Sequence, residues 1–89
     1  MEGKLVSDFK TIRARLEVLA EILVLCRKPT AKTRIMYKTN MSYLGVQKSI
    51  RQLRELELLG LDDNSAKYVT TEKGLEFIRR NAALQDLIK

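Results

Sequence analysis

Apolar residues recur at three- and four-residue steps through most of this 89-residue chain, and this helical period constrains its fold more than any other feature. The longest series follows Ser7 and Asp8, either of which can cap a helix. Its second half holds too many apolar residues for a single stripe. We therefore expect a long, central first helix that is covered on more than one side, with this series: Phe9, Ile12, Leu16, Leu19, Leu23, Cys26.

Two further helices are predicted after Pro29. Thr30 is a candidate cap for a short helix that ends near Lys38, and a turn follows. Ser42 is a candidate cap for a longer helix, which Gly60 is expected to end. At about 100° per residue, this helix places its polar side chains opposite one apolar side: Val46, Ile50, Leu53, Leu56.

The remainder of the chain predicts a hairpin and a last helix. Residues 62–65 have the composition of a tight turn, and Lys67 to Thr70 alternates polar and apolar residues as a strand does. Thr70 or Thr71 can cap a helix over about 71–88, with one apolar stripe formed by Leu75, Ile78 and Ala82.

The predicted order is helix, short helix, helix, hairpin, helix, within a single domain that spans residues 1–89. The fold class is mainly α with a small β-hairpin. A short helix, a tight turn and a longer helix form a helix-turn-helix, and the hairpin supplies the wing of a winged helix-turn-helix.

Basic residues are concentrated in one segment of the chain. Between Arg27 and Arg54 there are eight Lys or Arg residues and no Asp or Glu, whereas the rest of the chain has nine basic and eleven acidic residues. The segment alone therefore carries more than the net charge of +6. Charge located in this way attracts polyanions, so double-stranded DNA is the expected partner.

Several functional classes are disfavoured by the residue inventory. The chain has no His and a single Cys, Cys26, which excludes an internal disulfide and a His-based zinc or catalytic site, and Cys26 is expected to be a buried small hydrophobe. We expect no enzyme activity, metal, cofactor or small-molecule ligand. Neither a long apolar run nor a signal peptide is visible, which predicts a cytoplasmic protein without a membrane partner.

Two stretches, "KTRIMYKTNMSY" from Lys32 to Tyr43 and "KYVTTEKGLEF" from Lys67 to Phe77, give the chain a resemblance to small archaeal winged-helix DNA-binding proteins. That family includes chromatin-associated proteins and transcription regulators. The resemblance implies a winged-helix fold and duplex DNA as the partner. Family members often reach the Gly-Leu after the third helix sooner than this chain, and those that dimerise through a coiled coil have a longer last helix.

Candidate DNA contacts follow from the helix-turn-helix geometry, in which the second helix of the pair enters the major groove and the first meets the backbone. Gln47 can bond adenine in a bidentate manner, and Lys48 or Arg51 can donate to guanine. Base-contact candidates are Ser42, Tyr43, Gln47, Lys48 and Arg51. Phosphate-contact candidates are Lys28, Lys32, Arg34, Lys38, Arg54 and Lys67.

The alternative interpretation of the charged side is a solvated helix face. Solvated faces normally mix signs, whereas Lys48, Arg51 and Arg54 place like charges along one side, which favours contact with a polyanion. Tyr37 and Tyr68 are expected to pack against the core with their hydroxyl groups in solvent.

A second apolar stripe on the last helix predicts a homodimer, because one small core does not cover both sides. Its residues are Phe77, Leu84, Leu87 and Ile88, and the alternative is that they dock onto the first helix. The leading hypothesis is a transcriptional regulator that binds a pseudo-palindromic site as a homodimer. A low-specificity architectural chromatin protein and a winged-helix protein-interaction module are the alternatives.

Overall fold

The computed structural model describes the backbone of residues 2–87 and the side chains of residues 14–87. The elements in this part of the chain follow the order α1 Glu2–Leu25, α2 Lys32–Thr39, α3 Tyr43–Glu55, β1 Leu59–Asp62, β2 Lys67–Thr70 and α4 Glu72–Leu87. The two strands form an antiparallel hairpin, in which Leu59 pairs with Thr70 and Asp62 with Lys67. This order confirms the predicted winged helix-turn-helix.

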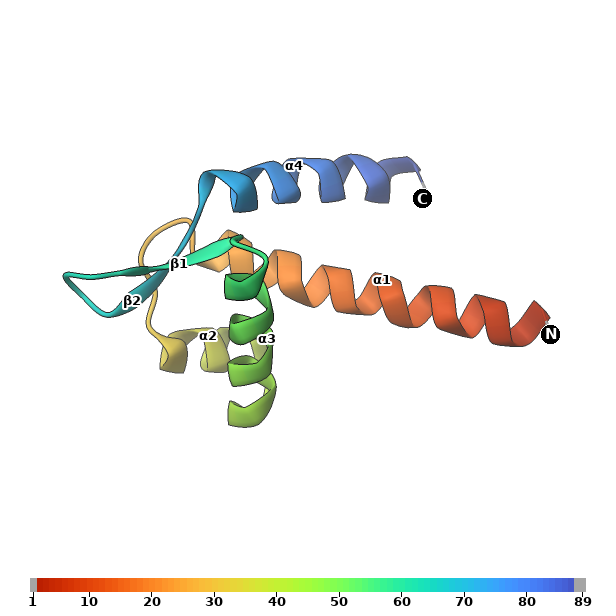
Figure 1. Cartoon of the computed structure of the whole chain (residues 1–89). Helices are drawn as coiled ribbons and strands as arrows, with labels where there is room; N and C mark the ends of the chain where they lie inside the picture. The colour runs from red at the N-terminus through yellow and green to blue at the C-terminus, as the bar shows by residue number, and fades with distance from the viewer. Residues whose placement is uncertain (1, 88–89) are drawn as a thin grey trace.

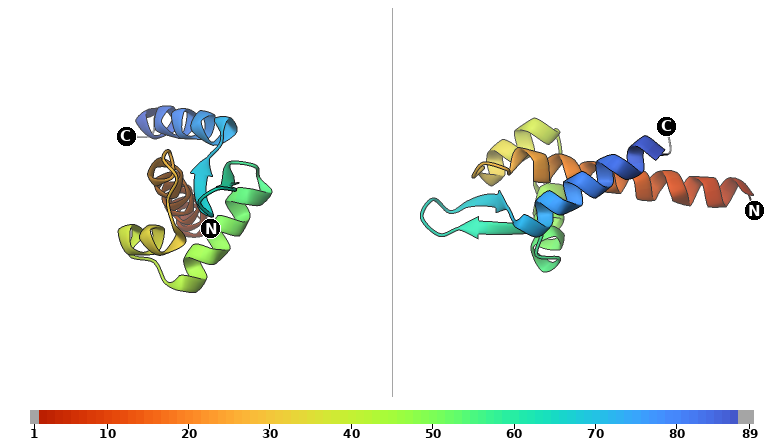
Figure 2. Two further views of the ribbon diagram at one scale, coloured as in Figure 1. Left: turned by 90° about the vertical axis from the view of Figure 1, so that its left-hand side faces the viewer. Right: turned by 90° about the horizontal axis from the view of Figure 1, so that it is seen from above.

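Helices α2, α3 and α4 gather around the C-terminal part of α1, and the hairpin extends from the same end of the molecule (Figures 1 and 2). The N-terminal half of α1 projects away from this body, so the molecule is elongated, with extents of 50 × 26 × 21 Å. Helix α1 begins at Glu2, so the predicted start at Ser7 or Asp8 is wrong.

The core is built on the C-terminal half of α1. Its fully buried side chains there share one face, while Val24 on the outer side remains 38% exposed. Helix α1 is therefore central, as predicted, although its buried residues form one broad face. The core contains Leu19, Ile22 and Leu23 of α1, Cys26 directly after this helix, and Ile35, Val46, Ile50, Leu53, Leu58 and Leu59.

Cys26 is fully buried, which confirms the prediction that it behaves as a small hydrophobe. Burial raises the pKa of its thiol to about 11, although a hydrogen bond with the Thr30 side chain acts in the opposite direction. The thiol is therefore protonated at neutral pH and lacks the thiolate character that reactive cysteines need.

Thr30 does not cap α2, contrary to the prediction. The helix begins at Lys32 after Ala31, which makes no side-chain cap hydrogen bond. The Thr30 hydroxyl instead donates to the carbonyl oxygens of Lys28 and Leu25, at 2.7 and 3.0 Å. Its backbone exchanges two 2.9 Å hydrogen bonds with Tyr68 of β2, so the loop between α1 and α2 is bonded to the root of the wing.

The start of α3 follows the prediction, because the Ser42 side chain accepts a hydrogen bond from the Gly45 N–H at 3.1 Å. Its end does not. The helix ends at Glu55, and the predicted stop residue, Gly60, lies in β1 opposite Val69. Leu56 at the C-cap is 47% exposed rather than buried.

Glu57 provides the helix stop that Gly60 was expected to supply. It adopts the left-handed conformation with φ of 63°, although this conformation favours glycine. Its N–H donates to the Arg54 carbonyl at 3.0 Å, and the Leu58 N–H donates to the Leu53 carbonyl at 2.9 Å. These two bonds form a Schellman motif, and the buried side chains of Leu53 and Leu58 supply its apolar contact.

Helix α4 is capped by Thr71, whose hydroxyl accepts from the Gly74 N–H at 3.0 Å and donates to the Glu57 carbonyl at 2.7 Å. Gly74 is buried, and a Cβ atom there would lie 2.2 Å from the Leu58 carbonyl oxygen and 2.5 Å from Cγ2 of Thr70. The first turn of α4 therefore contacts the backbone that leaves α3 at a distance that only glycine permits.

We expect Gly74→Ala to destabilise the fold by about 1–3 kcal/mol, because the added methyl overlaps a backbone oxygen that cannot rotate away. Chemical denaturation followed by circular dichroism measures this change. Gly60→Ala is the matched control, because its added Cβ would have no neighbour closer than 3.7 Å. Equal stability of the two variants would contradict the close approach at Gly74.

Candidate nucleic-acid interface

Helix α3 separates an apolar side from a cationic side. Val46, Ile50 and Leu53 are buried in the core, as predicted. Lys48, Arg51 and Arg54 are exposed on the other side of the helix, and Gln47 is half-buried at its edge. Because the buried side chains fix the rotation of the helix about its axis, the cations point outward in a defined direction.

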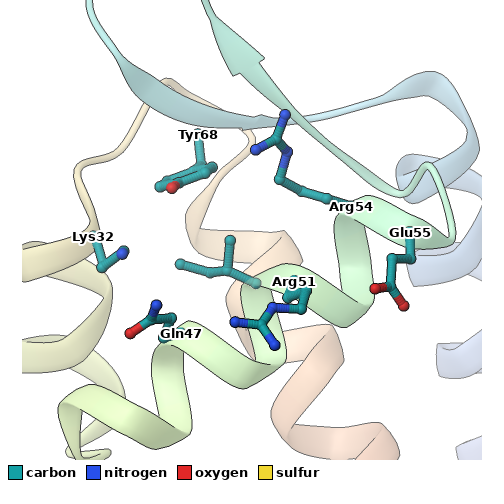
Figure 3. Close-up of a pocket in the computed structure, with 7 residues that line it drawn as sticks. Lys32, Gln47, Arg51, Arg54, Glu55 and Tyr68 are labelled. Carbon is teal, nitrogen blue, oxygen red and sulfur yellow. The ribbon is translucent and has the colours of Figure 1, made fainter.

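A hollow of about 400 Å³ lies between this side of α3, the start of α2 and the wing root. Figure 3 shows Tyr68 reaching over it from the strand, Lys32 on the α2 side, and Gln47, Arg51 and Arg54 along α3. Glu55 lies on the far side from Lys32. Three cations and a phenol ring thus surround one concave surface, a combination that suits a phosphate group and the sugar attached to it.

Tyr68 is placed by the backbone pairing of its residue with Thr30, and it packs against the core while it faces the hollow. Its predicted packing is confirmed. The same prediction for Tyr37 is wrong, because that side chain is 87% exposed. In α2 the residue that enters the core is Ile35, and Tyr37 lies two residues further, on the other side of the short helix.

Lys32 joins the two helices of the helix-turn-helix through a cation–π contact. Its Nζ lies 5.2 Å from the centre of the Tyr43 ring, at the start of α3. Contacts of this type are favourable by about 0.5–1 kcal/mol at exposed sites. The contact brings together one predicted phosphate residue and one predicted base residue.

The cations from Arg27 to Arg54 form no salt bridge with any side chain that the structure describes. Those of α4 differ. Glu76 accepts from Arg79 and, at 2.8 Å, from Arg80. These hydrogen bonds, that from Arg79 first, lower the pKa of the Glu76 carboxyl. Within the described residues, the cations of α2 and α3 are therefore not paired in salt bridges, whereas two of those in α4 are.

The structure places the predicted contacts unequally. Lys32 and Arg54 line the hollow together with two of the base-contact candidates, Gln47 and Arg51. Lys28 is exposed in the loop before α2, and Arg34 and Lys38 are exposed on α2, but none of the three lines the hollow. Ser42 Oγ serves as the α3 cap.

Lys67 lies apart from the other phosphate candidates. It is exposed in β2 and pairs across the hairpin with Asp62, next to the turn that begins with Asp63. Two carboxylates at this turn give the tip of the wing a negative charge. The basic surface therefore extends over α2, α3 and the wing root, and excludes the wing tip.

Two residues of this surface received no role in the sequence analysis. Leu44 is 76% exposed in the first turn of α3, and Glu55 lines the hollow at the last turn. The position of Leu44 could be recognised on a helical wheel, because it falls with Lys48 and Arg51 and opposite the core residues. The contribution of Glu55 depends on where the wing folds back, which the helical period does not reveal.

The predicted dimer stripe divides in the structure. Phe77 is half-buried and packs against the core, whereas Leu84 and Leu87 of α4 are 47% and 82% exposed. Ile88 lies outside the described residues. Of the three described members of the stripe, Phe77 packs against the domain, and Leu84 and Leu87 remain exposed.

A core-mounted helix-turn-helix with a paired hairpin and a basic outer face defines a class of DNA-binding domain. A family model described as winged helix-turn-helix matches residues 12–89, and the chain belongs to this family. Domains of this family typically bind DNA and have no enzyme activity. No curated protein matches the sequence at a significant level. None of the described helices is long and apolar enough to cross a membrane.

We expect Arg54→Gln and Lys32→Gln each to reduce the slope of log K against log salt concentration for duplex DNA by about one unit, because each removes one predicted phosphate contact. Binding titrations at several salt concentrations measure the slope. Arg79→Gln is the control, since it removes the same charge from a residue paired with Glu76 on α4. An equal change of slope in all three variants would contradict a local phosphate site.

Proposed function

We propose that this chain is a transcriptional regulator that binds duplex DNA through α3, acting as a homodimer on a pseudo-palindromic site. The observation that carries the proposal is the cationic side of α3, whose Lys and Arg residues form no salt bridge with the side chains that the structure describes, and which the buried opposite side holds in one orientation. Such a surface presents a preformed shape to a groove lined with phosphate groups.

The outer side of α3 supplies the base contacts in this proposal. Its N-terminal half carries Tyr43, Gln47 and Lys48, with Ser42 at the N-cap, and Arg51 follows about one turn later. Residues in this half of a recognition helix are those that reach base edges in the major groove. Gln47 suits adenine, while Lys48 and Arg51 suit the two acceptors of guanine.

The surrounding cations supply the phosphate contacts. Lys32 and Arg54 act at the hollow beneath Tyr68, and the more peripheral residues Lys28, Arg34 and Lys38 extend the contact over the loop and α2. Lys67 contributes least, because the acidic wing tip repels the phosphate backbone of the DNA. Phosphate contacts of this kind set the register of the domain on the duplex without reading its sequence.

Homodimerisation is supported by the apolar residues that α4 leaves in solvent. Leu84 and Leu87 occupy the last two turns of the described helix, and Ile88, the remaining member of the predicted stripe, is four positions after Leu84 in the sequence. Two copies joined there have two-fold symmetry, which matches an inverted repeat in DNA. The resemblance to small archaeal winged-helix proteins is in accord with either a regulator or a chromatin protein.

Selection of bound duplexes from a random library tests this proposal. We expect enrichment of an inverted repeat whose half-sites contain adenine and guanine positions for Gln47, Lys48 and Arg51. The three single alanine variants of these residues should each relax the preference at one position, at about 1–3 kcal/mol per bidentate contact.

Competition with random duplex DNA is the complementary measurement. A regulator should retain its selected site against an excess of random DNA at moderate salt. Displacement at equal concentration would favour the architectural chromatin protein, which needs the basic surface but little base readout. Absence of any salt-dependent binding to duplex DNA would leave only the protein-interaction module.

The dimer is tested by the double substitution Leu84→Lys and Leu87→Lys, which we expect to convert the protein to a monomer because it places two charges in the proposed interface. Sedimentation equilibrium of the intact chain measures the mass. Leu61→Lys is the matched control, since Leu61 is an exposed leucine of the wing. A wild-type chain that sediments as a monomer would remove the dimer from the proposal.

A further inference from the structure

Leu44 is an apolar residue in a position where the helix is otherwise polar. It is the second residue of α3, and its side chain is 76% exposed, although leucine is ordinarily a core residue. The core of the domain is already supplied by Val46, Ile50 and Leu53 on the other side of the helix. Leu44 therefore makes no evident contribution to the packing of this domain.

The neighbours of Leu44 connect it with the proposed reading surface. Together with Gln47, Lys48 and Arg51 it lines an open hollow of about 340 Å³ on the outer side of α3. Gln47, Lys48 and Arg51 follow Leu44 by three, four and seven positions, so the four residues form one continuous strip along two turns of the helix. Leu44 is the apolar member of this strip and lies at its N-terminal end.

The chemistry of the strip argues against a protein partner at this position. An apolar protein surface laid over Leu44 would also cover Lys48 and Arg51, neither of which forms a salt bridge within the described part of the chain. Burial of two unpaired cations is costly. The edge of a duplex offers apolar and anionic groups side by side, because phosphate groups flank the bases.

The major groove presents one apolar group, the C5-methyl of thymine. We propose that Leu44 recognises a thymine methyl at the base step next to the one that Gln47 contacts. This inference rests on the proposed binding of duplex DNA through α3, and it adds a residue that specifies sequence without a hydrogen bond. The first turn of a recognition helix is the part that lies closest to the base edges, which is where Leu44 stands.

Replacement of single thymines by uracil in the selected duplex tests this directly, because it removes the methyl and leaves base pairing unchanged. For the wild-type chain we expect one thymine in each half-site at which this replacement weakens binding about fourfold, the effect of one methyl-sized apolar group. In Leu44→Ala the uracil and thymine duplexes should bind equally at that position. The comparison is a double-mutant cycle between one side chain and one methyl group.

Leu56→Ala is the matched control, since Leu56 is the exposed leucine at the other end of α3. This variant should keep the full uracil effect. Thermal unfolding of both variants verifies that they remain folded. The inference is overturned if no thymine position responds to uracil in the wild type, or if Leu44→Ala retains the response. Either result leaves DNA binding intact, whereas loss of all duplex binding by the wild type would overturn the proposed function as well.

Discussion

The burial of one side of α3 in the core that it shares with α1, α2 and β1 is the constraint on which the rest of the structure depends. Val46, Ile50 and Leu53 occupy the same core as Ile22 and Leu23. Apolar burial of this kind is the main favourable term in a domain of this size. It also determines orientation, because a helix fixed along one side presents the other side in a constant direction. The direction in which the cationic side of α3 points is therefore set by the packing of the core.

The wing is connected to the same frame by hydrogen bonds as well as by the buried side chain of Leu59. Thr30 and Tyr68 pair through their backbones, and the Thr70 hydroxyl donates to the carbonyl of Leu23 at 2.5 Å. The Thr70 N–H donates to the carbonyl of Cys26 at 2.8 Å. These bonds satisfy carbonyl groups at the end of α1, which would otherwise be buried without partners. The root of the hairpin is thus positioned by the first helix of the chain.

Much of the fold could be predicted from the sequence because it follows from local periodicity. The order of elements, the Ser42 cap and the inward side of α3 all depend on residues within a few turns of one another. The wrong predictions concern residues whose conformation depends on segments distant in the sequence. Thr30 pairs with a strand almost forty positions later and so does not cap α2, and Glu57 adopts a conformation that composition assigns to glycine. The hollow beneath Tyr68 has the same origin, because it forms only where the hairpin folds back over α2 and α3.

The sequence reveals the basic surface as a segment without acidic residues, but it does not reveal which of these basic residues lie together in space. Lys32 and Arg54 are twenty-two positions apart, and the tertiary fold brings them to one concavity. Tyr37 is exposed, contrary to the prediction, because a two-turn helix has room for few core residues and Ile35 takes the fully buried position in α2.

The contact between Gly74 and the Leu58 carbonyl fixes the orientation of α4 relative to α3, in addition to its effect on packing. Leu58 closes the end of α3, and Gly74 belongs to the first turn of α4, so the two helices meet at a joint with no side chain between them. Because no flexible side chain separates the two backbones, a rotation of α4 would move the end of α3 with it. In a pair of chains held together by their α4 helices, this contact would fix the separation of the two α3 helices. That separation would in turn fix the spacing between the two half-sites on a duplex.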